Sequence, residues 1–90
     1  MEFDEFKSLR DQATAGLIKC EDIKQPMELR TLGYKYINGA SCDEDVYEHE
    51  FSLYEKDKHT AVFLQTYVER EGGMYYQSLY TSNGKLSDDY

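Results

Sequence analysis

The spacing of hydrophobic residues changes once along this chain of 90 residues, and that change limits the possible folds more than any other feature. In residues 3–17, apolar side chains recur at intervals of three and four, which places them on one face of a helix. From Tyr34 onward the pattern alternates, as it does in strands that bury one face of a sheet. Because short connections join these segments, we expect them to pair as antiparallel neighbours.

The expected fold is therefore α+β, with an N-terminal helix packed on a three- to four-stranded antiparallel meander. Gly16 is expected to end the helix nearby. Strands are predicted at 34–37, 46–55, 60–70 and 74–81, with turns at Asn38-Gly39, 71–73 and 82–84. The alternating pattern leaves open which face of the last strand is buried. The predicted core contains Phe6, Leu9, Val62, Leu64 and Val68.

Residues 18–33 allow two interpretations. Pro26 cannot lie inside a continuous helix, but it can open a short one, with Leu29 and Leu32 facing inward and Gly33 closing it. Alternatively, the first strand begins near Met27. We favour this strand interpretation, in which the strand is defined from Tyr34 and the pattern leaves its start before Tyr34 open. Residues 1–90 are expected to form one small acidic domain, with 85–90 as a loose acidic tail.

Negative charge is concentrated in one segment. The formal net charge is −8, and residues 41–57 contribute −6 of it, because they hold seven acids and only Lys56 as a base. Alternation places Glu48 and Glu50 on one face, which also carries Tyr67 and Glu69 of the next strand. This surface either keeps the protein soluble or binds a basic partner. Repulsion between the two glutamates, with no nearby Lys or Arg in the sequence, favours a binding site.

Motifs for catalysis are absent from the sequence. It has no phosphate-binding loop, no Gly-x-Ser-x-Gly elbow and no His-Glu-x-x-His. Cys20, Cys42, His49 and His59 lack the short spacings of a metal site, so we expect free thiols, no metal and no cofactor. His49 lies between Glu48 and Glu50, but alternation points it to the opposite face. We expect a protein that is not an enzyme and has no catalytic residues.

Charge and hydropathy also limit the partners. A net negative chain is poorly suited to bind nucleic acid directly. No apolar run approaches the roughly 18–20 residues of a membrane span. The acidic start, Met-Glu-Phe-Asp-Glu-Phe, differs from the basic start of a signal peptide. We expect a cytoplasmic protein (in the host cell if phage-encoded), without membrane or direct nucleic-acid contacts, that is a monomer or a homodimer.

In size, charge and Tyr/Glu content the chain resembles the small acidic inhibitors made by phages and mobile elements, such as DNA-mimic, anti-CRISPR and anti-restriction proteins. This resemblance lies in composition, and no residue role is carried over from it. Separately, carboxylates on a rigid surface can occupy a Lys/Arg groove that binds phosphates. We therefore expect a stoichiometric inhibitor of a basic nucleic-acid-binding enzyme or complex. The alternatives are an immunity or antitoxin-like protein that neutralises a basic nuclease toxin, and a structural module that homodimerises through its Tyr-rich face or a strand edge.

The predicted partner-binding residues all come from the acidic segment and the strand that follows it. They are Asp43, Glu44, Asp45, Glu48, Glu50, Tyr54, Glu55, Asp57, Tyr67 and Glu69.

Overall fold

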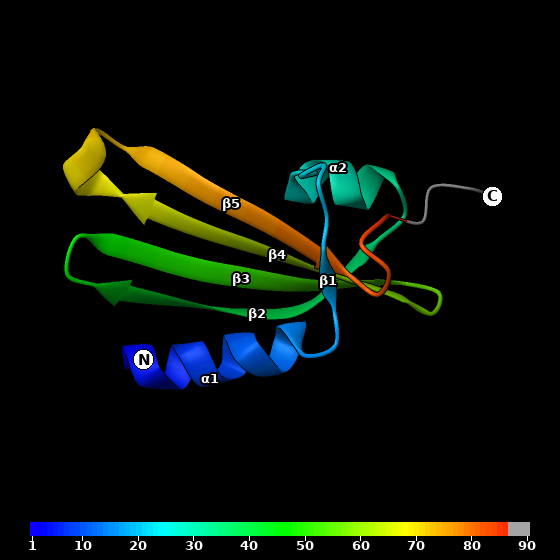
Figure 1. The fold of residues 1–90 in the computed structure, drawn as a ribbon, viewed down its shortest axis with the longest axis horizontal. Coiled ribbons are helices and arrows are strands. Elements are labelled where there is room, and N and C mark those ends of the chain that lie inside the picture. The colour runs from blue at the N-terminus through cyan, green and yellow to red at the C-terminus, as the bar shows by residue number, and fades with distance from the viewer. Residues whose placement is uncertain (87–90) are drawn as a thin grey trace.

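An antiparallel sheet of five strands forms the centre of the computed structural model, which describes residues 1–86 apart from the side chain of Glu71. The elements follow the order α1 (Phe3–Thr14), β1 (Ile18–Lys19), α2 (Pro26–Thr31), β2 (Lys35–Glu44), β3 (Tyr47–Lys56), β4 (His59–Val68), the 3-10 turn η1 (Glu69–Glu71) and β5 (Met74–Thr81). In space the strands are ordered β1-β5-β4-β3-β2 (Figure 1). The α+β prediction is confirmed, although the short strand β1 and hence the number of strands were not foreseen.

Helix α1 packs on one face of the sheet, which we call the α1 face. Phe6 is buried there with Cys42, Phe51 and Val62, and we call these four residues the α1 cluster. The ring centroids of Phe6 and Phe51 lie 5.7 Å apart. Leu9 is 37% exposed, so its prediction as a core residue was wrong. The reason is geometric, because the 3.6-residue helical turn carries Leu9 to the border of the stripe that Phe6 lies on.

The three other predicted core residues lie on this same face. Val62 and Val68 are buried, whereas Leu64 is only partly buried at the edge of the α1 cluster. Gly16 has a φ of 77° and follows the end of α1, as predicted.

Helix α2 covers one end of the opposite face, which we call the α2 face. Leu29 is completely buried and belongs to a buried cluster on this face, which we call the α2 cluster. Its members are Cys20, Leu29, Tyr34, Tyr54, Ala61, Phe63 and Leu79. Gln25 and Glu28 form a capping box around Pro26, and Gly33 closes the helix at a φ of 102°. The short-helix interpretation of this region is therefore correct, and the favoured interpretation of residues before Tyr34 as the start of a strand was wrong.

The first hairpin turns at Asp45 and Val46 instead of the predicted Asn38-Gly39. Strand β2 runs through Asn38 and Gly39, with a register shift between Tyr36 and Asn38. A side chain at Gly39 would collide with the backbone oxygen of Phe51, so this glycine allows two strands to approach closely. A glycine within a strand often has that role, and the sequence pattern alone does not separate it from a turn.

The two cysteines lie on opposite faces of the sheet. Cys20 belongs to the α2 cluster and Cys42 to the α1 cluster, and both are free and buried. A disulfide between them would have to cross the sheet, so the prediction of free thiols is confirmed.

The predicted loose tail, 85–90, lies partly outside the described residues, which end at Leu86. Within the described part, Leu86 packs against the α2 cluster, and the Lys85 amide donates a hydrogen bond of 3.1 Å to Asn83 Oδ1. No helix among residues 1–86 is long and apolar enough to cross a membrane.

Candidate functional site

Beyond the end that α2 covers, the α2 face carries two rows of polar and aromatic side chains across the sheet. In each row the residues of β2, β3, β4 and β5 lie opposite one another. The first row is Asp43, Glu48, Tyr67 and Tyr75, and the second is Ser41, Glu50, Gln65 and Gln77. We call these eight residues the acidic patch. All of them except Gln77 line a hollow of about 340 Å³.

Three carboxylates of the acidic patch lie close together on the sheet. Asp43 lies directly opposite Glu48 across the β2–β3 pair, and Glu50 follows two residues later on the same face. Among residues 1–86, no Lys or Arg forms an ion pair with any of the three. Like charges placed opposite each other on a sheet are destabilising. The arrangement therefore opposes folding and needs another explanation.

A chain of amide hydrogen bonds fixes one of these carboxylates. Gln65 Nε2 donates to Glu50 Oε1 at 3.0 Å, and Gln77 Nε2 donates to Gln65 Oε1 at 2.7 Å. Gln77 in turn exchanges two side-chain hydrogen bonds with Gln25, at 2.7 and 3.2 Å, and Gln25 caps α2. The Glu50 carboxylate is thus held relative to β4, β5 and α2. A side chain that is already ordered loses little entropy when it binds a partner.

Two tyrosines stand beside the carboxylates. The ring centroids of Tyr67 and Tyr75 lie 4.8 Å apart, and Tyr67 is directly opposite Glu48. Tyr75 is well exposed. Aromatic faces attract cations, and a carboxylate next to such a face suits the guanidinium of Arg or the ammonium of Lys. Tyr75 was not among the predicted residues, because only its pairing with Tyr67 shows which face of β5 carries it.

The structure brings four of the predicted residues together, namely Asp43, Glu48, Glu50 and Tyr67. Tyr54 was expected to contact a partner, but it lies under α2 and is only 2% exposed. Its strand position is on the same face as Glu50, and the difference arises because α2 covers that end of the face.

The other predicted acids lie elsewhere. Alternation along β3 places Glu55 on the α1 face, and Glu44 Oε1 also lies there, 3.7 Å from His49 Nε2. Asp57 lies in the turn of the β3–β4 hairpin, at the opposite end of β3 from Asp45. Asp45 and Glu69 are exposed near the other end, where Arg70 Nη2 lies 3.9 Å from Asp45 Oδ2. The segment 43–57 is therefore not one continuous acidic surface.

His49 belongs to the α1 face, as alternation predicts. The ring centroids of His49 and Phe3 lie 5.0 Å apart, and His49 Nδ1 is 3.0 Å from Thr66 Oγ1. It is separated by the sheet from the carboxylates of Glu48 and Glu50, its neighbours in sequence. Within residues 1–86, no group of three His, Cys, Asp or Glu side chains is placed to hold a metal ion.

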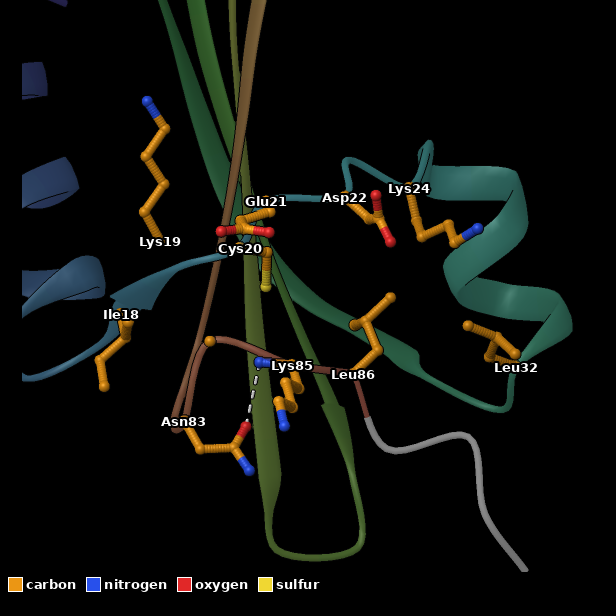
Figure 2. A pocket seen from close by; sticks show the side chains of 11 residues that line it. Ile18, Lys19, Cys20, Glu21, Asp22, Lys24, Leu32, Asn83, Lys85 and Leu86 are labelled. Carbon is orange, nitrogen blue, oxygen red and sulfur yellow. Dashed lines mark hydrogen bonds between the residues drawn. The ribbon is translucent and has the colours of Figure 1, made fainter.

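A larger hollow of about 740 Å³ lies at the other end of the molecule, between β1, the segment before α2 and residues 83–86. Lys19, Lys24 and Lys85 line it, but Figure 2 shows their side chains pointing in different directions. They do not converge on a point where an anion could bind. None of the predicted partner-binding residues lines this hollow.

Comparisons of the chain with protein-family models, with curated proteins and with solved structures give no match. A functional interpretation therefore rests on the geometry of the acidic patch.

Proposed function

We propose that this protein binds a basic surface of a nucleic-acid-binding enzyme or complex and inhibits it stoichiometrically. The observation that carries the proposal is the acidic patch, in which Asp43, Glu48 and Glu50 lie together beside the Tyr67–Tyr75 pair. In the part of the chain that the structure describes, none of these three carboxylates forms an ion pair with Lys or Arg. A Lys or Arg side chain entering the hollow would meet a carboxylate and an aromatic face together.

The acidic patch should act mainly on the rate at which a basic partner associates. A single exposed ion pair contributes only about 0–1 kcal/mol. Several carboxylates on one surface, however, attract a basic partner over a distance and raise the association rate roughly 10- to 1000-fold. Binding also relieves the repulsion between Asp43 and Glu48, which the free protein leaves uncompensated.

The partner class follows from the kind of surface that carries dense positive charge. Enzymes that act on nucleic acids hold Lys and Arg in grooves that contact phosphates, and a rigid set of carboxylates can compete for those grooves. Phage anti-CRISPR, anti-restriction and DNA-mimic inhibitors are proteins of this kind. A basic nuclease toxin has the same type of groove, so the immunity interpretation predicts the same binding surface and differs in the partner.

A pair of variants with equal net charge tests the role of the acidic patch. The patch variant carries Asp43→Asn, Glu48→Gln and Glu50→Gln. The control carries Glu44→Gln, Glu55→Gln and Asp57→Asn, which remove three acids of the same segment from outside the patch. Each immobilised protein is used to capture partners from cell lysate, and the purified partner is then assayed for nucleic-acid binding with and without the inhibitor.

The proposal predicts that the wild type and the control capture a basic nucleic-acid-binding protein and displace its nucleic acid at a one-to-one ratio. The patch variant should bind at least about tenfold more weakly, mainly through slower association, and its binding should depend less on salt. Equal inhibition by the patch variant and the control would show that the acidic patch is only a solubilising surface.

A further inference from the structure

One strand edge of the sheet is left open along part of its length. Strand β1 pairs with Tyr80 and Thr81 of β5, and the Cys20 amide donates a 2.7 Å hydrogen bond to the Leu79 carbonyl. Among residues 1–86, no strand pairs with the outer side of residues 74–78. Figure 1 shows this first half of β5 at the margin of the sheet, with β1 and α2 toward its other end. We call residues 74–78 the free edge of β5.

The backbone groups that point outward along this edge can be assigned. In an antiparallel pair, the N–H and C=O of a residue point to the same side, and the side alternates from one residue to the next. The Leu79 carbonyl points outward to Cys20, the residue after β1, so the backbone groups of Gln77 and Tyr75 also point outward. Unpaired groups of this kind are a template for a further strand.

The free edge also lacks the features by which proteins prevent strand addition. Strand β5 contains no charged residue, no Pro and no Gly, in a chain of which 31% is charged. Met74, Tyr75 and Tyr76 are consecutive and 49%, 58% and 52% exposed. Charged residues, bulges and prolines are the usual protection of an edge strand.

The other edge of the sheet, β2, is protected in these ways. It carries Lys35, Asp43 and Glu44, and a register shift interrupts its pairing with β3 next to Gly39. Bulges and strand glycines twist or weaken an edge and so oppose further pairing. The contrast between the two edges selects β5.

We propose that the free edge of β5 pairs antiparallel with the same edge of a second copy of this chain. The occupant follows from self-complementarity. With Tyr76 on the two-fold axis, Tyr75 lies opposite Gln77 of the partner subunit, and Gln77 lies opposite the partner subunit's Tyr75. Each of these pairs can exchange both backbone hydrogen bonds, and all the outward groups of Tyr75 and Gln77 are then satisfied. A register shifted toward Leu79 is blocked, because β1 already pairs there.

The charge of the chain also fits this occupant. Two copies that each carry −8 repel one another least where they meet through a surface without charge, and β5 carries no charged residue. The resulting sheet is continuous, and its two-fold axis stands perpendicular to it. Both acidic patches therefore lie on the same side of the dimer. The inference does not rest on the proposed function, since it uses only the backbone edge and its composition.

The dimer is tested with the full chain by sedimentation equilibrium over a range of protein concentrations at low and high salt. We expect a reversible monomer–dimer equilibrium that shifts toward dimer as salt screens the repulsion between the copies. Tyr76→Glu places two carboxylates opposite each other at the two-fold axis and should raise the dissociation constant about tenfold or more.

Tyr36→Glu is the matched control, because Tyr36 is 50% exposed, lies on the β2 edge and gives the same change in net charge. It should leave the dissociation constant unchanged. A chain that stays monomeric at all concentrations, or a dimer that Tyr36→Glu disrupts and Tyr76→Glu does not, would overturn the proposal.

A second measurement does not depend on whether a variant folds. Amide hydrogen exchange of the wild type, followed by NMR, should show that the Tyr75 and Gln77 amides become protected as protein concentration rises. Amides of β2 should show no such dependence. Exchange at Tyr75 and Gln77 that does not change with concentration would rule out pairing at this edge.

Discussion

Replacing Leu29 with Ala should be one of the most damaging single changes in this protein. Leu29 is completely buried between α2 and the sheet, against Tyr54, Phe63 and Leu79. Removing the equivalent of three methylene groups at about 0.8 kcal/mol each costs about 2.4 kcal/mol, and the cavity raises the total to about 2.5–5 kcal/mol. A protein of this length has about 5–13 kcal/mol of unfolding free energy, so the loss is a large fraction of it.

The matched control is Leu9→Ala, which makes the same chemical change in α1. Leu9 is 37% exposed at the border of the packed stripe, and Ala is a better helix former, so the cost should stay below about 1 kcal/mol. Urea denaturation followed by circular dichroism measures both values. In a thermal melt, each kcal/mol corresponds to roughly 4–8 °C in a domain of this size, so the two variants should differ clearly. Equal losses for Leu29→Ala and Leu9→Ala would refute the assignment of α2 as the helix that covers this end of the sheet.

Three further predictions follow from the sheet. Gly39→Ala should lower the unfolding free energy by about 1–3 kcal/mol, because the new Cβ collides with the Phe51 carbonyl oxygen, and an unchanged urea midpoint would contradict the close strand approach. Glu48→Gln should raise the unfolding free energy by about 0.2–1 kcal/mol at low salt and less at high salt, because it removes one of two opposed carboxylates, whereas a loss of stability would argue against repulsion. Cys20 and Cys42 are each 5% exposed and free, so alkylation followed by mass spectrometry should label neither in the native protein and both after denaturation without reductant.

Local patterns in the sequence determined most of the secondary structure. The three- and four-residue spacing that includes Phe6 predicted α1, and alternation predicted much of β3, β4 and β5, because these periods follow from backbone geometry alone. Alternation also separated His49 from Glu48 and Glu50 correctly, since neighbouring residues of a strand point to opposite faces. The concentration of acids in residues 41–57 was equally visible, although its meaning for function stays a prediction.

Only the tertiary structure decided which of those acids lie together. The sequence places Tyr54 and Glu50 on one face of β3, but α2 covers Tyr54 and leaves Glu50 open, and the docking of a short helix depends on contacts between distant residues. Strand pairing likewise brought Asp43 opposite Glu48 and Tyr75 beside Tyr67, because register is set by the two strands together. The open edge of β5 has the same origin: β1 is two residues long and stops pairing at the end of that strand, which no local pattern in either segment specifies.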